Sequence, residues 1–600
     1  MRKVPAVRTV LVANRGEIAV RIIRTCRELG LRTVAVYSDA DSQAMHVRMA
    51  DHAERIGPAA ARDSYLSAAA IVAAAEKSGA DAVHPGYGLL SEDAEFARAV
   101  LDAGLVFVGP PPEVVALMGN KILARGAAQA CDLPVPPGSA GAVSEPEEAH
   151  AVAERIGWPV VVKASFGGGG RGMRVVHDHP GLEGAMAAAA REAGAAFGRS
   201  EVHLERYLER PRHVEVQVLA DEYGTVLHLG DRDCSVQRRH QKLIEEAPAP
   251  DLPAAVRAAL REGAVRLARE VGYVGAGTVE FLVLPGTGEY FFLEMNTRLQ
   301  VEHGVTELVT GLDLVEAQLA VAAGEKIRLA QEDIRLEGHA IQARIAAEEP
   351  AESFRPGPGR VTGLTLPQGP WVRCDMGVAA GDTVAAEYDS MFGKVLARGA
   401  DRDSSRRRLI GALDELRVVG VPTTAAYLRN VLASAEFAEV AHDTGSVERD
   451  WVPDPSPLDA PPAETGGLGT AGPAEQTRPV RRVRIATDRG PVDVAVYGVA
   501  RPHDAAFATG RRPERTERTA VRAADGPGTQ PVAPMNATVV SVAVEQGVTV
   551  ALGDTLLVLE AMKMEIEVKA ETAGVVERLR VTVGEPVEAG TILADVVPVA

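Results

Sequence analysis

The chain lacks the long apolar runs that membrane proteins need. Hydrophobic residues make up 46% of its 600 residues and charged residues 24%, an ordinary balance for a globular chain with a core. No run of about 18 apolar residues occurs. The short apolar run at 9–13, behind Arg2 and Lys3, has the length of a strand rather than of a signal peptide. We therefore expect a cytoplasmic protein of several domains that does not contact membranes.

Clustered cysteines and an excess of positive charge are also missing. The cysteines are widely separated, with no spacing typical of a metal or redox site, so we expect free thiols in a reducing compartment. They are Cys26, Cys131, Cys234 and Cys374. The net charge of −18 would repel the phosphates of a nucleic acid, so we expect no nucleic-acid partner.

Two common nucleotide-binding motifs are absent as well, namely GxGxxG after the first strand and GK[ST] after a glycine-rich loop. What is present is a buried strand at 9–13, a helix that ends at Gly30 and a second strand at 33–37. This order predicts a βαβ unit and a doubly wound sheet. The loop at 84–88 follows a strand end, where such sheets collect function, but a plain turn is an equal alternative.

A run of four glycines lies at 167–170. A β-branched strand that ends in Lys163 precedes it, and a second strand at 173–176 follows. Glycine backbone allows close approach to an anion, so this loop is predicted to close over phosphates. A flexible linker is the alternative, but two framing strands argue against it.

Acidic side chains interrupt two predicted strands. Glu280 lies in one of them, and Glu294 and Asn296 lie in the next, on the same face as each other because strand side chains alternate. Carboxylate and amide oxygens suit Mg²⁺ that bridges nucleotide phosphates. Buried acids tied to arginines are the alternative. The following segment, 297–303, places a candidate base, Glu302, beside cations.

Five cationic side chains, with His240 among them, fall within residues 231–242, and two glutamates follow at 245–246. A solvated face is the common interpretation of such a run. The adjacent acids favour an anion site with local counter-charges.

The end of the chain contains an internal repeat. A shift of 37 positions places Ala537 on Gly574, and it superposes Gly547 and Gly553 on later glycines. Both halves show short Val/Leu-rich strands, which predicts two copies of one β unit. Lys563 lies at the connection between the halves, where its amine would be offered to solvent.

These segments resemble two known families. Residues 561–564 (Ala-Met-Lys-Met) and 533–535 resemble the biotinyl carrier domain, and residues 8–445 resemble biotin carboxylase, an ATP-grasp enzyme. The specific motifs are 232–235, 294–298, 300–303 and 388–391. Together they resemble the alpha chain of biotin-dependent acyl-CoA carboxylases of the acetyl-/propionyl-CoA type. The lipoyl carriers share the carrier fold but typically lack the two flanking methionines.

The resemblance implies an α/β multidomain fold. It comprises a doubly wound N-terminal domain (1–118), an ATP-grasp domain with a glycine-rich lid (119–330) and an α+β C-terminal biotin carboxylase domain (331–450). A linker (451–530) follows, with a possible small hairpin at 483–497. After it comes an all-β, flattened-barrel biotinyl domain (531–600).

It also implies ATP- and bicarbonate-dependent carboxylation, through carboxyphosphate, of biotin attached to Lys563. The general base would be Glu302, and Arg344 would stabilise the biotin enolate. Mg²⁺ or Mn²⁺ would be held by Glu280, Glu294 and Asn296. Bicarbonate would be surrounded by Lys242, Arg298, Gln300 and Val301. ATP would be bound by Lys121, Lys163, Gly168, Gly169, Gly170, Glu205, Leu208, His213, Gln237 and His240.

No predicted segment after residue 450 has the size of a carboxyltransferase. We therefore expect a separate carboxyltransferase beta subunit, a biotin protein ligase, and dimerisation of the biotin carboxylase part within a larger hetero-oligomer. The acceptor would be acetyl-CoA or propionyl-CoA, with pyruvate or another acyl-CoA as alternatives. An ATP-grasp ligase with a lipoyl-like carrier and a non-catalytic scaffold are further alternatives.

Overall fold

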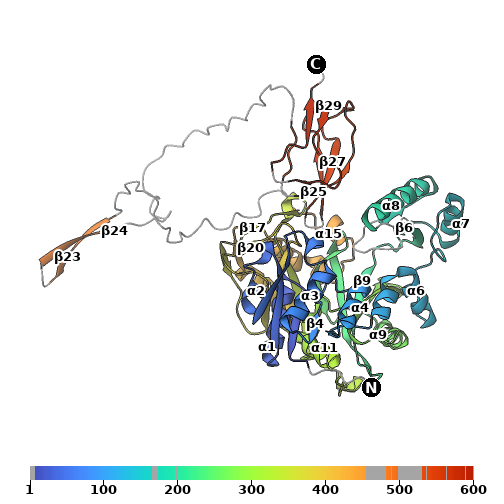
Figure 1. Ribbon diagram of the computed structural model, residues 1–600, viewed down its shortest axis with the longest axis horizontal. Coiled ribbons are helices and arrows are strands. Elements are labelled where there is room, and N and C mark those ends of the chain that lie inside the picture. The colour runs from blue at the N-terminus through green and yellow to red at the C-terminus, as the bar shows by residue number, and fades with distance from the viewer. Residues whose placement is uncertain are drawn as a thin grey trace.

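The computed structural model describes residues 7–164, 173–197, 201–453, 481–487, 490–496, 530–534, 537–561, 564–587 and 590–598. Figure 1 shows a large body, a lobe that carries α7 (Pro146–Ile156) and α8 (Leu182–Phe197), and a separate β domain at the C-terminal end. Within the described residues, none of the helices combines the length and the apolar character needed to span a bilayer.

The N-terminal sheet has the order β3-β2-β1-β4-β5, and its neighbouring strands run parallel. Its strands are β1 (Thr9–Val12), β2 (Arg32–Ser38), β3 (His52–Gly57), β4 (Ala82–His84) and β5 (Val106–Phe107). Its helices are α1 (Gly16–Glu28), α2 (Met45–Met49), α3 (Ala68–Ser78), α4 (Ala94–Asp102) and α5 (Pro112–Gly119). The predicted βαβ unit and doubly wound sheet are confirmed.

The centre of the body is an antiparallel eight-stranded sheet in the order β13-β12-β9-β10-β11-β14-β21-β19. Its strands are β9 (Arg212–Ala220), β10 (Val226–Arg238), β11 (Gln241–Ala247), β12 (Gly275–Val283), β13 (Tyr290–Asn296), β14 (His339–Ala346), β19 (Val372–Met376) and β21 (Met391–Gly399). β11 pairs with β14. This pairing joins strands of the expected ATP-grasp domain and strands of the expected C-terminal domain into one sheet.

Helices that pack on this sheet, and one short helix that packs on another of them, bury its hydrophobic faces. They are α6 (Lys121–Ala130), α9 (Ala254–Glu270), α10 (His303–Thr310), α11 (Leu314–Ala322), α12 (Arg402–Glu415), α13 (Ala425–Ala433), α14 (Ala435–Ala438), which packs on α13, and α15 (Ser446–Arg449). Short strands complete the C-terminal part of the body, namely β15 (Glu348–Glu349), β16 (Arg355–Pro356), β17 (Gly359–Arg360), β18 (Gly363–Thr365), β20 (Thr383–Val384) and β22 (Arg417–Val419).

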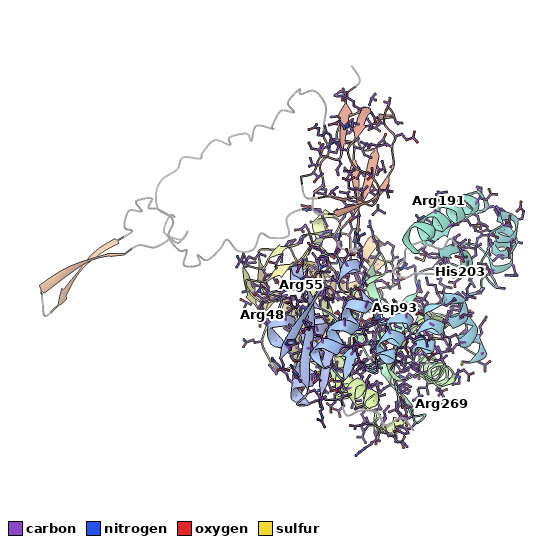
Figure 2. The ribbon with its side chains drawn as sticks, viewed as in Figure 1. Arg48, Arg55, Asp93, Arg191, His203 and Arg269 are labelled. Atoms are coloured by element: carbon purple, nitrogen blue, oxygen red, sulfur yellow. The ribbon has the colours of Figure 1, made fainter. Side chains whose placement is uncertain are left out.

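The lobe has its own three-stranded sheet, in the order β7-β6-β8. The strands are β6 (Val160–Ala164), β7 (Met173–Val176) and β8 (Val202–Arg206). Figure 2 labels Arg191 and His203 on this lobe, away from Arg48 and Arg55 at the opposite side of the body. The glycine run at 167–170 connects β6 to β7 in the chain and lies outside the described residues.

The C-terminal β domain confirms the predicted repeat. Its strands are β25 (Ala537–Val542), β26 (Thr549–Val550), β27 (Thr555–Ala561), β28 (Met564–Lys569), β29 (Gly574–Leu579), β30 (Pro586–Val587) and β31 (Ala594–Val597). A shift of 37 positions carries β25 onto β29 and β26 onto β30. The superposed glycines Gly547 and Gly584 have φ of 92° and 86°, which are left-handed values that favour glycine.

The predicted small hairpin is present as β23 (Arg481–Thr487) and β24 (Gly490–Val496), which pair antiparallel. Residues 454–480, 488–489 and 497–529 of the expected linker lie outside the described residues.

A buried ionic network joins β11, β14 and α12. The Glu246 carboxylate lies 2.7 Å from Nε2 of His339, and it accepts hydrogen bonds from Nε and Nη2 of Arg402 at 2.7 and 2.9 Å. Burial alone would raise the pKa of Glu246, but the hydrogen bond to His339 and the charge of Arg402 outweigh burial and lower the pKa to about 2.

We predict that Glu246→Gln lowers the stability of the chain at neutral pH. The folded-state pKa lies below the ordinary value of 4.5, so the carboxylate stabilises the fold above that value, and this stabilisation is lost as pH falls towards about 2. The shift corresponds to roughly 3 kcal/mol. Urea midpoints should therefore differ most at neutral pH, and the difference should shrink below about pH 4.5 and vanish only near or below about pH 2.

The matched control is Glu352→Gln, which removes an exposed ion pair with Arg355 and should leave the midpoint unchanged. A difference between wild type and Glu246→Gln that is the same at every pH would contradict an ionic origin.

Candidate functional site

A single cavity of ≈ 1450 Å³ brings most of the predicted site residues together. It is lined by the loop after β4, by β9, β11, β12, β13 and β14, by the lobe, and by residues of the C-terminal β domain. The predicted residues that line it are Lys121, Lys163, Glu205, Leu208, His213, Gln237, His240, Lys242, Glu280, Glu294, Asn296, Arg298, Gln300, Val301 and Arg344. Glu302 is fully buried behind this lining, and Gly168, Gly169, Gly170 and Lys563 lie outside the described residues.

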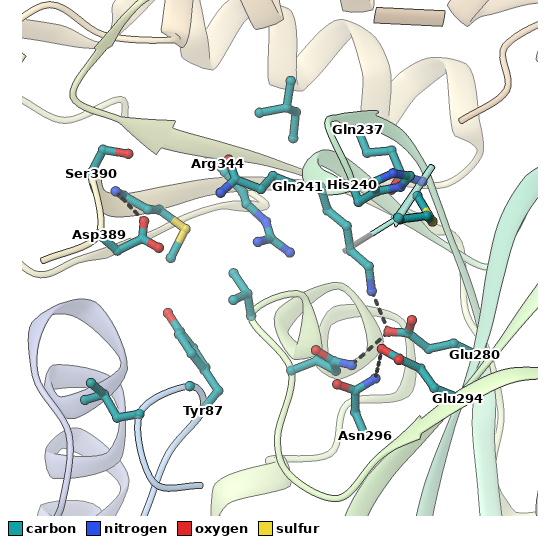
Figure 3. Close-up of a pocket in the computed structure, with 18 of the residues that line it drawn as sticks. Tyr87, Gln237, His240, Gln241, Glu280, Glu294, Asn296, Arg344, Asp389 and Ser390 are labelled. Carbon is teal, nitrogen blue, oxygen red and sulfur yellow. Dashed lines mark hydrogen bonds and ion pairs between the residues drawn. The ribbon is translucent and has the colours of Figure 1, made fainter. Parts of the chain in front are cut away.

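The two candidate metal acids are direct cross-strand neighbours. Glu280 on β12 pairs with Glu294 on β13, and Thr278 pairs with Asn296, as the alternation predicted. Figure 3 shows Glu280, Glu294 and Asn296 on one wall of the cavity. Burial and the neighbouring Glu280 carboxylate raise the pKa of Glu294, because two negative charges lie close together in a buried site. The pair can therefore accept an additional cation.

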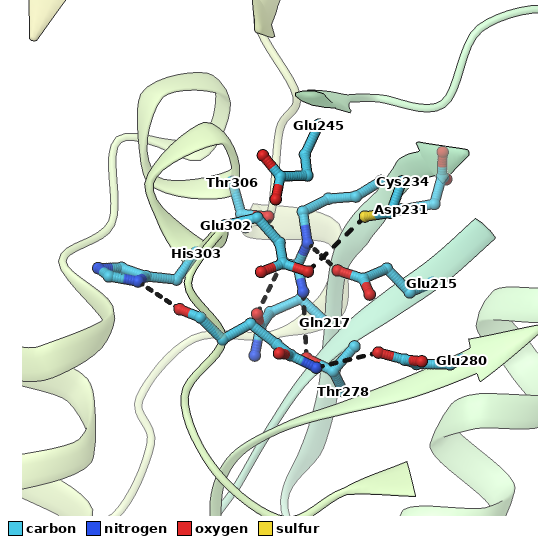
Figure 4. Close-up of polar contacts among 12 residues, drawn as sticks. Glu215, Gln217, Asp231, Cys234, Glu245, Thr278, Glu280, Glu302, His303 and Thr306 are labelled. Carbon is cyan, nitrogen blue, oxygen red and sulfur yellow. Dashed lines mark hydrogen bonds and ion pairs between the residues drawn. The ribbon is translucent and has the colours of Figure 1, made fainter. Parts of the chain in front are cut away.

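Lys242 is the centre of the charged cluster. Its Nζ lies 2.6 Å from Glu215, 2.8 Å from Glu280 and 2.7 Å from Glu302. Burial alone would lower the pKa of Lys242, but these three carboxylates outweigh burial and raise the pKa well above its ordinary value. The lysine is therefore charged at neutral pH. Figure 4 shows Glu215, Glu280 and Glu302 converging from different elements.

Glu302 also contacts Arg344 and Cys234. Nη2 of Arg344 donates to Glu302 at 3.0 Å, and the Cys234 thiol lies 3.8 Å from the same carboxylate. Burial alone would raise the pKa of Glu302, but Lys242, Arg344 and Arg232 hold it below its ordinary value. The carboxylate is thus ionised at neutral pH and able to accept a proton from a bound acid.

Arg344 is shared by two acids. Its Nε donates to Glu245 at 2.5 Å, and Gln342 donates to the other oxygen of that carboxylate at 3.0 Å. Burial and the negative charge of Glu302 raise the pKa of Glu245, although the positive charge of Arg344 acts in the opposite direction. Figure 3 places the Arg344 guanidinium in the middle of the cavity, between Tyr87 and the acids.

A second set of contacts lies at the lobe end of the cavity. Nζ of Lys163 lies 2.5 Å from Glu205, which also forms an ion pair with Arg125 and lies 3.4 Å from Nε2 of His203. Burial and nearby Lys163 lower the pKa of Lys121, although Glu294 opposes them. Two lysines and one arginine at this end form a cationic surface suited to phosphates.

The loop at 84–88 is part of the cavity and not a plain turn. The Asn14 amide donates to the carbonyls of Pro85 and Tyr87 at 2.7 and 2.8 Å, which fixes the loop. The Tyr87 hydroxyl donates to Glu17, and Glu17 lies 3.2 Å from the buried Lys394. Tyr87 therefore faces the cavity from a rigid support.

The cation run at 231–242 divides between the core and the cavity. Arg232 is fully buried and donates to Glu215, Gln217, Thr306 and Thr278. Arg238 lies over the Phe354 ring, whereas His240 and Lys242 line the cavity. Only part of the run therefore lines the cavity, because Arg232 points into the core.

Sequence reasoning missed Glu215 and Arg125 as members of the site, and it named Glu245 only as a local counter-charge and not as a partner of Arg344. Glu215 could have been found, because it lies between His213 and Gln217 on one face of a strand with period two. Glu245 reaches Arg344 only through the pairing of β11 with β14, which no local pattern reveals.

The C-terminal β domain presents one end to the cavity. Ala537, Thr538, Gly584 and Val587 line it. Thr538 pairs with Glu560, and Ala561 pairs with Met564, so β27 ends and β28 begins at this same end. Met562 and Lys563 stand between these strands in the sequence and lie outside the described residues.

Family models match four parts of the chain. These are the biotin carboxylase N-terminal domain at residues 6–115, the ATP-binding domain of the carbamoyl-phosphate synthase L chain at 120–330, the biotin carboxylase C-terminal domain at 342–449, and a model described as biotin-requiring enzyme at 530–596.

The chain is 43% identical to the biotin-dependent acyl-coenzyme A carboxylase alpha3 subunit of Mycobacterium leprae over 598 residues, 98% of each chain. It is 51% identical to the biotin carboxylase of Pseudomonas aeruginosa over 72% of this chain and 95% of that one. Among solved structures, biotin carboxylase from Campylobacter jejuni covers 74% of this chain, and 99% of its own, with 44% identity and a TM-score of 0.72.

A second similar structure is the biotin carboxylase domain of Hydrogenobacter thermophilus 2-oxoglutarate carboxylase, solved with MgADP, ADP and bicarbonate. It covers 74% of this chain and 97% of its own, with 43% identity and a TM-score of 0.72. The four matched parts occur in the order predicted from the motifs, and the M. leprae subunit spans all of them. The chain therefore belongs to the biotin-dependent carboxylases, as a polypeptide that joins an ATP-dependent biotin carboxylase to a biotin carrier domain.

Proposed function

We propose that this chain is the alpha subunit of an acyl-CoA carboxylase, which carboxylates biotin on its own Lys563 for transfer to acetyl-CoA or propionyl-CoA by a separate carboxyltransferase subunit. One observation carries the proposal: the cavity that contains Lys242, Arg344 and the acid pair is also lined by Thr538 of the carrier domain, whose strand partner Glu560 lies next to the end of β27 at Ala561. The full-length similarity to an acyl-CoA carboxylase alpha subunit supports the choice of acceptor.

The acid pair fits a divalent cation. Glu280 and Glu294 are cross-strand neighbours, the Asn296 amide lies 3.4 Å from Glu294, and the raised pKa of Glu294 marks negative charge without enough compensation. Hard oxygen donors of this kind suit Mg²⁺ or Mn²⁺. When bound, the metal would neutralise charge on the phosphates of ATP.

The basic side chains would position the two anionic substrates. Lys121 and Lys163 lie at the lobe end, where they would hold phosphates, and the glycine run between β6 and β7 would cover them. Glu205 and Leu208 would contact the adenine through their backbone groups. His213, Gln237 and His240 would hold the rest of the nucleotide. Bicarbonate would lie near Lys242, Arg298, Gln300 and Val301.

Glu302 would act as the general base. Bicarbonate is a weak nucleophile until it loses its proton, and the Glu302 carboxylate is buried, ionised and 2.7 Å from Lys242. Arg344, fixed by Glu245 and Glu302, would place positive charge beside the ureido oxygen of biotin, where negative charge develops. Biotin supplies the nitrogen that carries the carboxyl group between the two subunits.

We predict that Lys563→Arg abolishes attachment of biotin but preserves the catalytic body. Arginine keeps the charge but lacks the amine that a biotin protein ligase would acylate. Avidin blots should lose their signal, whereas bicarbonate-dependent carboxylation of free biotin should continue. Lys569→Arg, an exposed change on β28, is the matched control and should remain biotinylated. A retained avidin signal in Lys563→Arg would rule out this attachment site.

We predict that Glu302→Gln lowers biotin carboxylation by about 10²–10⁴-fold with little change in MgATP affinity. Glutamine keeps the size of the side chain but accepts no proton. Steady-state kinetics and nucleotide titration on one preparation would test this. Glu280→Gln should behave differently and raise the Mg²⁺ requirement. A Glu302→Gln rate within about threefold of wild type would exclude Glu302 as the base.

The same geometry predicts the pH profile. Because the pKa of Glu302 is held below 4.5, the carboxylate is ionised throughout the neutral range. Activity should show no loss from protonation of Glu302 between about pH 8 and about pH 6.

The acceptor is decided by the partner subunit. One of the pyruvate carboxylase subunits of Methanothermobacter thermautotrophicus is 48% identical over 71% of this chain and 87% of its own, so a pyruvate acceptor is the second candidate.

We predict that the carboxyltransferase purified with the chain transfers the carboxyl group to acetyl-CoA or propionyl-CoA. Radiolabelled bicarbonate, with each acyl-CoA and pyruvate in parallel, would test this, and transfer to pyruvate alone would overturn it.

A further inference from the structure

Glu92 connects the N-terminal domain to the segment that precedes Glu302. It lies in the loop between β4 and α4, directly before Asp93, which caps α4. Its Oε2 accepts a hydrogen bond from Nε of Arg298 at 2.9 Å, and its Oε1 accepts one from the backbone N–H of Thr297 at 3.2 Å. One carboxylate therefore holds both the backbone and the side chain of adjacent residues in another domain.

The other contacts of Arg298 lie within its own segment. Nη2 donates to Asn296 at 2.7 Å, and Nη1 donates to Gln300 at 2.8 Å and to the Leu299 carbonyl at 3.2 Å. These partners would move together with Arg298 if the segment shifted. Glu92 belongs to a different domain, so the hydrogen bond from Nε fixes the guanidinium, and the hydrogen bond from Thr297 fixes the backbone, relative to the N-terminal domain.

Adhesion between domains is the alternative role for this ion pair. The Glu92 side chain is 40% exposed, and exposed ion pairs stabilise folds little. A buried ion pair, Arg21 with Glu307, already joins the same domains. The location of Glu92 beside a cavity-lining cation therefore points to a local effect on the site.

We propose that Glu92 is a positioning residue that orients Arg298 towards bicarbonate. The proposal rests on the function proposed above, which places Arg298 at the bicarbonate site. Two physical effects of Glu92 have opposite signs. Its negative charge repels a nearby anion, so a purely electrostatic role predicts tighter bicarbonate binding when the charge is removed. Loss of orientation predicts weaker productive binding, because a small misplacement of a positioning group slows the reaction.

The test is the bicarbonate dependence of Glu92→Gln and Glu92→Ala in the full chain. Glutamine has one carbonyl oxygen, so it can replace one of the two hydrogen bonds, whereas alanine replaces none. We expect kcat/KM for bicarbonate to fall about tenfold in Glu92→Gln and further in Glu92→Ala, with the MgATP dissociation constant within about twofold of wild type. A lower KM for bicarbonate, or no change, would overturn the proposal.

Glu113→Gln is the matched control, because Glu113 forms an exposed ion pair with Arg98 at 3.0 Å in the same domain, away from the cavity lining. It should match wild type in every measurement. Arg298→Lys completes a double-variant cycle. If Glu92 acts through Arg298, Glu92→Gln combined with Arg298→Lys should be no slower than Arg298→Lys alone. Additive losses would show that Glu92 acts elsewhere.

Failure of this inference is distinguishable from failure of the proposed function. Wild type that hydrolyses ATP without dependence on bicarbonate would refute the function. Wild type that depends on bicarbonate, with Glu92 variants equal to it, would refute only the role of Glu92. Thermal melting of each variant checks that the fold is intact, and Glu92→Gln provides the measurement if Glu92→Ala does not fold.

Discussion

The site depends on one buried ammonium group. Nζ of Lys242 on β11 lies within 2.8 Å of Glu215 on β9, Glu280 on β12 and Glu302 before α10. Burying any one of these charges alone would be strongly unfavourable, so each requires the others. The cluster therefore fixes the relative positions of three strands and of the segment that carries the candidate base. Removing Lys242 would leave three carboxylates without their shared cation.

The charges in this cluster balance except at two acids. Lys242, Arg232 and Arg344 offset Glu215, Glu280 and Glu302, and the acids that remain, Glu245 and Glu294, have raised pKa values. The two differ in their surroundings. Glu245 is fully buried and already hydrogen-bonded to Arg344 and Gln342, whereas Glu294 lines the cavity beside Asn296. An added cation is therefore better accommodated beside Glu294 and Asn296 than beside Glu245.

Local patterns were sufficient to predict the strands and the acid pair but not the contacts between domains. The period of two placed Glu294 and Asn296 on one face, and the 37-residue repeat anticipated the carrier domain. The inward turn of Arg232 was not predictable, because β10 contains register shifts between His228 and Asp231 and again after Asp233. A charged run therefore does not reveal which of its members are buried.

Three side chains of the proposed active site come from strands of one continuous sheet, whereas two of those proposed for nucleotide binding come from the lobe. Lys242, Glu280 and Arg344 lie on β11, β12 and β14 of the central sheet. Lys163 and Glu205 lie on β6 and β8, whose sheet has no strand in common with it. A rotation of the lobe would change the separation of Lys163 from Glu294 without breaking any strand pairing of the central sheet. The fold thus allows the nucleotide end of the cavity to open while the Lys242 cluster stays assembled.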